Sequence, residues 1–182
     1  MEGTTETKDL NGSDGFLMSG IDSADLSGGT LSTAGDINGD GYDDIIIGAR
    51  QGDAGGGNSG ESYVIFGKSG SFSAEMDIAK LNGSNGFRLD GASSGDQSGR
   101  SVSTAGDING DGYDDLLAST YHTDTLGYLF YGPITANTDT SQVHSTFDAC
   151  RKVQALGDTN DDGMDAFGCN TPPSFWFLGE AL

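Results

Sequence analysis

Basic residues are scarce in this chain of 182 residues. Eight Lys and Arg stand against 28 Asp and Glu, which gives a formal net charge of −20. Binding to nucleic acid or to anionic lipid needs a cationic surface that displaces counterions from phosphate groups. We therefore expect neither partner. The surplus of carboxylates either keeps the protein soluble or serves bound cations, which would relieve the repulsion among the carboxylates.

Long apolar runs and cysteines are scarce as well. No apolar run approaches the roughly 20 residues that a membrane helix requires, so we predict no membrane span. The opening MEGTTETKDL lacks the basic and apolar regions of a signal peptide, so an exported form would be a mature chain or part of a longer one. Cys150 and Cys169 are compatible with one disulfide in an oxidising compartment, although two thiols alone do not establish it.

What the chain does contain is an internal repeat. The segment STAGDINGDGYDD runs from Ser32 to Asp44 and recurs letter for letter from Ser103 to Asp115, 71 positions later. A third and less regular copy, residues 150–170, aligns with residues 28–48 and pairs Asp158 with Asp36. Self-similarity at this period indicates stacked supersecondary units that share one core.

Each unit predicts short β-strands, because β-branched and aromatic residues cluster between Gly, Asp and Asn. The expected strands are Leu31–Ala34, Val102–Ala105 and Val153–Leu156 first; Ile45–Ile47 and Leu116–Ala118 second; residues 62–66, 127–131 and 174–178 third; and residues 15–20 and 86–91 fourth. No helical period persists over three turns. We predict an all-β fold of antiparallel four-stranded blades, with a flexible tail at 1–9 and one domain at 10–182. That domain comprises an N-terminal strand within 10–20 and repeats at about 28–91, 99–149 and 150–182.

The acidic loop in each unit has the spacing of a calcium site. Oxygen-bearing side chains fall at positions 1, 3, 5 and 9, a Gly at position 6 permits a sharp turn, and position 7 offers a backbone carbonyl. Zinc would want Cys or His, and magnesium a stricter octahedron. The predicted Ca²⁺ ligands are Asp36, Asn38, Asp40, Tyr42 and Asp44 in the first loop, and Asp107, Asn109, Asp111, Tyr113 and Asp115 in the second.

The third loop matches the pattern less well. It keeps Asp158, Asn160, Asp162 and the Met164 carbonyl, but position 9 is Ala166 and Asp165 stands one place early. We expect weak binding there, through Asp165 or water. The alternative for all three loops is an Asp- and Gly-rich turn without an ion. An EF-hand is excluded, because position 12 is Ile47 or Ala118 rather than Glu and the flanking segments are strands.

These motifs resemble the FG-GAP repeats of integrin α-chain β-propellers and their bacterial relatives. The two halves of that name correspond to Ile65–Gly67 (IFG) and Ile47–Ala49 (IGA), with the calcium loop between the first and second strands. The resemblance spans residues 10–182, although the second repeat reads AST at 118–120 and the third is degenerate. It implies propeller blades, calcium held on one rim for rigidity, and partner binding through loops.

The number of blades is too small to close a propeller ring. Propellers of this family have about seven blades, and this chain has about three. Two chains forming a homodimeric propeller, or a longer parent propeller, would complete the ring. The strand at 15–20 is also expected to pair with the strand at 174–178 and so complete the last blade.

The function expected is a non-enzymatic, extracellular or cell-surface calcium-binding module in adhesion or protein–protein interaction, with a protein or glycan ligand on one rim. Arg50, Arg100 and the loop Gly52–Gly60 are expected rim contacts. The alternatives are an accessory propeller of a larger secreted hydrolase or carbohydrate-active enzyme, and a calcium-dependent matrix or surface-layer protein. Ser93 in GASSG matches a hydrolase motif, but no helix or His partner follows, so no catalytic residue is predicted.

Overall fold

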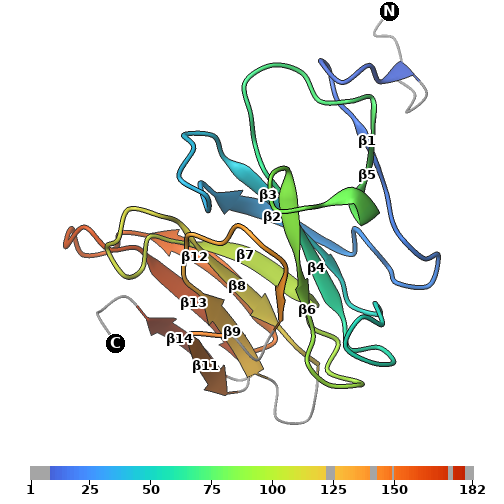
Figure 1. Ribbon diagram of the computed structural model, residues 1–182. Coiled ribbons are helices and arrows are strands. Elements are labelled where there is room, and N and C mark those ends of the chain that lie inside the picture. The colour runs from blue at the N-terminus through green and yellow to red at the C-terminus, as the bar shows by residue number, and fades with distance from the viewer. Residues whose placement is uncertain (1–8, 122–125, 140–142, 149, 172–173, 179–182) are drawn as a thin grey trace, which may run out of the picture.

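The computed structural model describes residues 9–121, 126–139, 143–148, 150–171 and 174–178. Apart from Asp9, the expected N-terminal tail lies outside these residues. Three β-sheets stand side by side in sequence order and form three blades (Figure 1). The all-β prediction is confirmed. None of the helices among the described residues has the length and apolar character to span a bilayer.

Blade 1 contains the antiparallel strands β2 (Thr30–Gly35), β3 (Asp44–Ala49), β4 (Glu61–Ile65) and β6 (Gly86–Asp90), with β10 (Thr138–Asp139) added in parallel at the outer edge. Blade 2 contains β7 (Ser101–Gly106), β8 (Asp115–Ser119), β9 (Leu126–Phe130) and β11 (Ser145–Asp148). Blade 3 contains β12 (Lys152–Gly157), β13 (Ala166–Thr171) and β14 (Ser174–Leu178). The first three predicted strands of each repeat are therefore present.

Burial in blade 1 follows the apolar pattern of the sequence. The run in β3 and the whole of β4 lie almost entirely in the interior, because sheets cover them on both faces. In β2 half-buried and exposed residues alternate from Thr30 to Thr33; Ala34 is fully buried, whereas Leu31 is exposed. The innermost strand of a blade thus turns only part of its surface to the core.

Neighbouring blades meet through apolar faces. Between blades 1 and 2 the core includes Ile46, Val64 and Phe87 on one side and Leu116 and Phe130 on the other. Between blades 2 and 3 a second core is built from the residues Ala105, Ile108, Leu117, Leu129, Cys150, Val153, Phe167 and Cys169. Burial of these side chains is the main force that stacks the blades.

The prediction for the N-terminal strand is wrong. Strand β1 (Leu17–Ser19) pairs in parallel with β5 (Glu75–Asp77), and not with β14. This two-stranded ribbon projects beyond blade 1 at the end of the molecule opposite blade 3 (Figure 1). The ribbon and the short 3₁₀ helix η2 (Ile78–Lys80) pack on the outer face of blade 1. They contribute Met18, Phe72, Met76, Ile78 and Leu81, and blade 1 contributes Ile45, Ile47, Ala49, Tyr63 and Ile65. The outer face of the first blade is therefore covered by the chain itself.

Candidate functional site

The three acidic loops occupy equivalent places in the three blades. Each follows the inner strand β2, β7 or β12 and leads into the second strand β3, β8 or β13. The ladder of each strand pair shifts register just before its loop, beside Gly35, Gly106 and Gly157. This irregularity ends the pairing and lets the chain swing out into the loop.

Within the first loop, the predicted ligand side chains fold back onto the loop backbone. Asp36 accepts hydrogen bonds from the amides of Asp40 at 2.9 Å and Gly41 at 2.8 Å. Asn38 Oδ1 accepts from Asp40 N at 2.9 Å, and Asp40 Oδ1 from Tyr42 N at 3.0 Å. The corresponding bonds of the second loop, at Asp107, Asn109 and Asp111, measure 2.8 to 3.0 Å. Two identical sequences thus form the same compact turn.

Position 6 of each loop needs a glycine. The φ angles of Gly41 and Gly112 are +88° and +90°, which L side chains rarely adopt. With that turn in place, the oxygens at positions 1, 3 and 5 lie on successive residues of one tight loop. Carboxylate and amide oxygens in such a loop are suitable ligands for a hard cation.

Position 9 differs from the other ligands because it is buried. Asp44 and Asp115 are 1% and 0% exposed. Asp44 accepts from Ile37 N at 3.1 Å and Gly67 N at 2.7 Å, and Asp115 accepts from Ile108 N at 3.0 Å and Gly132 N at 2.9 Å. Each carboxylate therefore ties the start of its loop to the end of the third strand.

Burial changes the acidity of these two carboxyl groups. It raises the pKa of Asp44 and of Asp115 from 3.8 to about 6, and the loop carboxylates at positions 5 and 1 push in the same direction. The backbone hydrogen bonds oppose the shift without cancelling it. A bound cation near these groups would stabilise their ionised form.

The described residues contain no group of three or more Asp, Glu, His or Cys side chains gathered closely enough to hold a metal ion. The loop oxygens instead accept amide hydrogens, as described above. What fits calcium is the donor set of the first two loops, which is entirely oxygen and includes in each loop one carboxyl group, Asp44 or Asp115, that is costly to leave buried and ionised.

The third loop forms the same turn with fewer anchors. Asp158, Asn160 and Asp162 make the equivalent bonds, at 2.9 to 3.3 Å, and all three residues are exposed. The pKa of Asp158 is lowered, chiefly by the hydrogen bond from Gly163 N. Position 9 is the buried Ala166, so no side chain ties this loop to the third strand of its blade.

The sequence did not reveal the role of position 8. Asp114 Oδ2 accepts from Asp36 N at 2.6 Å, and Asp165 Oδ2 accepts from Asp107 N at 3.2 Å. Each aspartate therefore reaches the acidic loop of the preceding blade. Asp165 serves this interface with the second loop, and its alignment with Asp114 in the repeat was the signal that could have shown it.

Glycines make room for these contacts between blades. A Cβ atom at Gly35 would lie 2.2 Å from Asp114 Oδ2, and one at Gly106 would lie 1.9 Å from Asp165 Oδ2. The equivalent Gly157 has nothing within 4 Å of that position. The Tyr113 ring similarly covers Gly39 of the preceding loop, where a Cβ atom would lie 2.4 Å from Tyr113 Cε1.

A disulfide joins Cys150 and Cys169, which are separated by 19 positions and flank the third loop. Cys169 lies on β13, and Cys150 lies two residues before the start of β12. Both cysteines are buried in the core between blades 2 and 3. A covalent bond thus links the two sides of the hairpin whose loop has no carboxylate at position 9.

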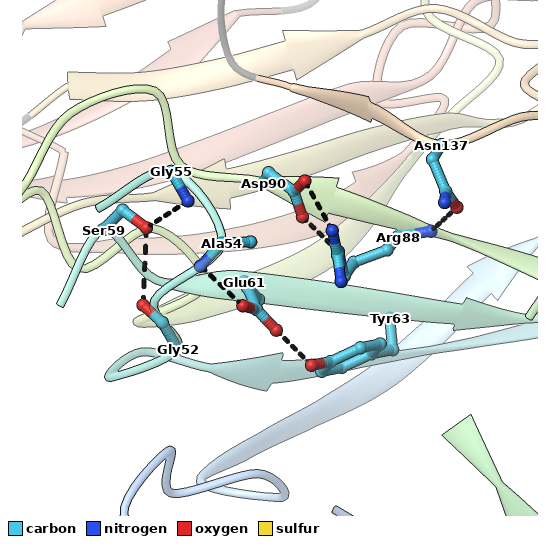
Figure 2. Close-up of polar contacts among 9 residues, drawn as sticks. All are labelled: Gly52, Ala54, Gly55, Ser59, Glu61, Tyr63, Arg88, Asp90 and Asn137. Atoms are coloured by element: carbon cyan, nitrogen blue, oxygen red, sulfur yellow. Dashed lines mark hydrogen bonds and ion pairs between the residues drawn. The ribbon is translucent and has the colours of Figure 1, made fainter. Parts of the chain in front are cut away.

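The expected rim loop at 52–60 is supported from within blade 1 (Figure 2). Glu61 is 5% exposed and accepts from Ala54 N at 2.9 Å, while the Tyr63 hydroxyl donates to its other oxygen. Burial, and then the Glu61 hydrogen bond, raise the pKa of Tyr63. Arg88 forms an ion pair with Asp90 on the same strand. Buried polar groups thereby hold this loop in one conformation.

Comparison with known families confirms the resemblance. The model of the FG-GAP repeat matches residues 27–65 and 98–144. The chain contains two FG-GAP repeats. These two segments include the first two acidic loops and the strands that flank them, whereas the third loop lies outside the match. No curated protein matches the chain.

Proposed function

We propose that this chain is a calcium-stabilised, propeller-type interaction module that acts outside the cell or at its surface. FG-GAP repeats form β-propeller-like interaction modules, which sets the general class. The observation that carries the proposal is the pair of identical oxygen-lined loops, each with a buried carboxyl group at position 9. Calcium would be bound by the side chains of Asp36, Asn38, Asp40 and Asp44, and by their equivalents in the second loop.

The role of calcium in this proposal is structural. The ion neutralises carboxylates that burial makes costly to ionise, so its binding free energy adds to the stability of the fold. Because Asp114 contacts the backbone of the first loop, ordering that loop also supports the interface between blades 1 and 2. No catalytic step is required of these residues.

Location outside the cell is supported by the Cys150–Cys169 bond, since disulfides persist in oxidising compartments. The partner is proposed to be a protein, bound through the loops of one rim. Ring closure by two chains stays a prediction, which light scattering tests by measuring the mass in millimolar calcium. A dimer would support it, and a monomer would contradict it.

The calcium proposal is tested by thermal unfolding of the wild type, Asp40→Ala and Asp111→Ala. In calcium each variant should melt at a lower temperature than the wild type, because each loses one ligand. In excess chelator the three proteins should melt within a few degrees of one another. Equal melting temperatures in calcium, or a wild type that does not respond to chelator, would contradict the proposal. Asp162→Ala serves as the matched control in the weaker third loop.

A further inference from the structure

Half of the basic residues of the chain line one cavity. The cavity has a volume of about 650 Å³ and is bordered by Arg50, Arg100, Arg151 and Lys152. The whole chain contains eight Lys and Arg among 182 residues, against 28 acidic ones. No Asp or Glu is among the described residues that line it. Such separation of charge in a strongly acidic protein indicates a site for an anionic group.

The cavity lies at the end of the blades opposite the calcium loops. Its lining includes the first residues of the three inner strands, Thr30 of β2, Ser101 of β7 and Lys152 of β12. The acidic loops follow the last residues of the same strands. The two ends of the inner strands therefore differ, because acidic loops follow one end and four of the eight Lys and Arg lie at the other.

None of the four cations of this cavity forms an ion pair with a described residue. The ion pairs among the described residues join Lys80 to Asp77 and Arg88 to Asp90, both away from the cavity. Arg100 instead lies over the Tyr121 ring, 4.2 Å from its centroid. Unpaired guanidinium groups keep their planar arrays of donors available for a carboxylate.

Backbone hydrogen bonds fix the positions of Arg100 and Arg151 at the cavity. Arg100 N donates to Ser119 O at 3.2 Å, and Arg151 N donates to Asn170 O at 3.1 Å. Ser119 Oγ also donates to Arg151 O at 3.3 Å, which joins blades 2 and 3 at this point. Arg100 and Arg151 occupy equivalent positions in their repeats. The stacking of the blades thus brings together charges that are 51 positions apart in the sequence.

We propose that this cavity binds an acidic peptide segment of a protein partner. Its volume falls within the range of roughly 300–1,000 Å³ that is common for ligand sites, which is more than one carboxylate group needs. Asn170, Thr30 and Ser101 add uncharged polar groups to the lining. A long polyanion is disfavoured, because the acidic surface around the cavity would repel its remaining charges. The proposal names the ligand class for the partner binding proposed above, and it does not depend on calcium.

The test uses the calcium-loaded chain and a fluorescein-labelled peptide of six Glu residues, with a peptide of six Gln as its uncharged counterpart. Fluorescence anisotropy at low salt should show saturable binding of the Glu peptide alone. Arg50→Glu/Arg151→Glu should weaken that binding at least about tenfold, because two attractive charges become repulsive. The control Lys68→Glu/Lys80→Glu changes the net charge equally outside the cavity and should bind within about twofold of the wild type.

Circular dichroism checks that each variant is folded. If the Arg50→Glu/Arg151→Glu variant does not fold, Lys152→Glu replaces it, because Lys152 is exposed. Absence of saturable binding, or equal weakening by the control, would overturn the proposal. A sulfated oligosaccharide that binds where the Glu peptide does not would also overturn it in favour of a glycan. Calcium-dependent melting without peptide binding would refute the proposed peptide site and would still support the structural role of calcium.

Discussion

The second and third loops show two ways of holding the same turn. Both keep Asp, Asn and Asp at positions 1, 3 and 5 with the same hydrogen-bond pattern, although Asn Oδ1 accepts at 2.9 Å in the second loop and at 3.3 Å in the third. The second loop adds the buried Asp115, which joins Ile108 N to Gly132 N. The third has Ala166 there and a disulfide across its hairpin. The turn therefore forms with or without an aspartate at position 9. The aspartate instead anchors its loop to the end of the third strand and adds a buried negative charge.

The largest effect is expected from Asp115→Ala. The change leaves two amides inside the protein without their acceptor and removes a proposed calcium ligand, so we expect a loss of about 4 kcal/mol of unfolding free energy in calcium. Urea unfolding with and without chelator measures it. The two carboxylate oxygens of Asp115 accept from different amides, so Asp115→Asn removes the charge, keeps one acceptor and sets its NH2 group against the other amide. The Asn variant should lose the calcium increment and keep, in chelator, part of the stability that the Ala variant loses. A calcium response unchanged in the Asn variant would contradict the assignment of the Asp115 charge to calcium binding.

An intermediate effect is expected from the glycines before the loops. Gly106→Ala places a Cβ atom against the Asp165 carboxylate and also forces alanine to a φ of +73°. Gly157→Ala meets open space at a φ of +76°, so only the backbone strain applies. We expect losses of about 3 and about 1 kcal/mol, respectively. Equal losses in urea unfolding would show that Asp165 does not bridge blades 2 and 3.

A further effect is expected in the pH dependence of the calcium-free protein. Because the folded pKa of Asp44 and Asp115 is about 6 and the unfolded value is near 3.8, the folded state holds more protons between these values. Stability in chelator should therefore fall as the pH rises from about 4 to about 6, and then level off. Calcium should remove this decline, since the ion favours the ionised carboxylates. Asp44→Asn/Asp115→Asn should flatten the curve in chelator, whereas a slope unchanged by the double variant would contradict the assignment.

Much of the fold could be predicted because it repeats. Identical loops and alternating or continuous apolar runs gave the first three strands of each blade their positions. The fourth strand of blade 2 and the partner of β1 could not be predicted, because Ser145–Asp148 and Glu75–Asp77 lack a strong apolar pattern and their pairing depends on tertiary contacts. Arg50 and Arg100 were expected on a rim, but only the stacking of blades brought Arg151 and Lys152 beside them.

The ribbon of β1 and β5 has a practical consequence for the choice of segment boundaries. The family match begins at residue 27, whereas Met18, nine positions earlier, packs on the outer face of blade 1. A segment cut at the family boundary would lose β1 and uncover part of the surface over Ile47 and Ile65. Exposed apolar area of this kind promotes aggregation. An expression segment that begins before residue 10 should give a more soluble protein than one that begins at 27.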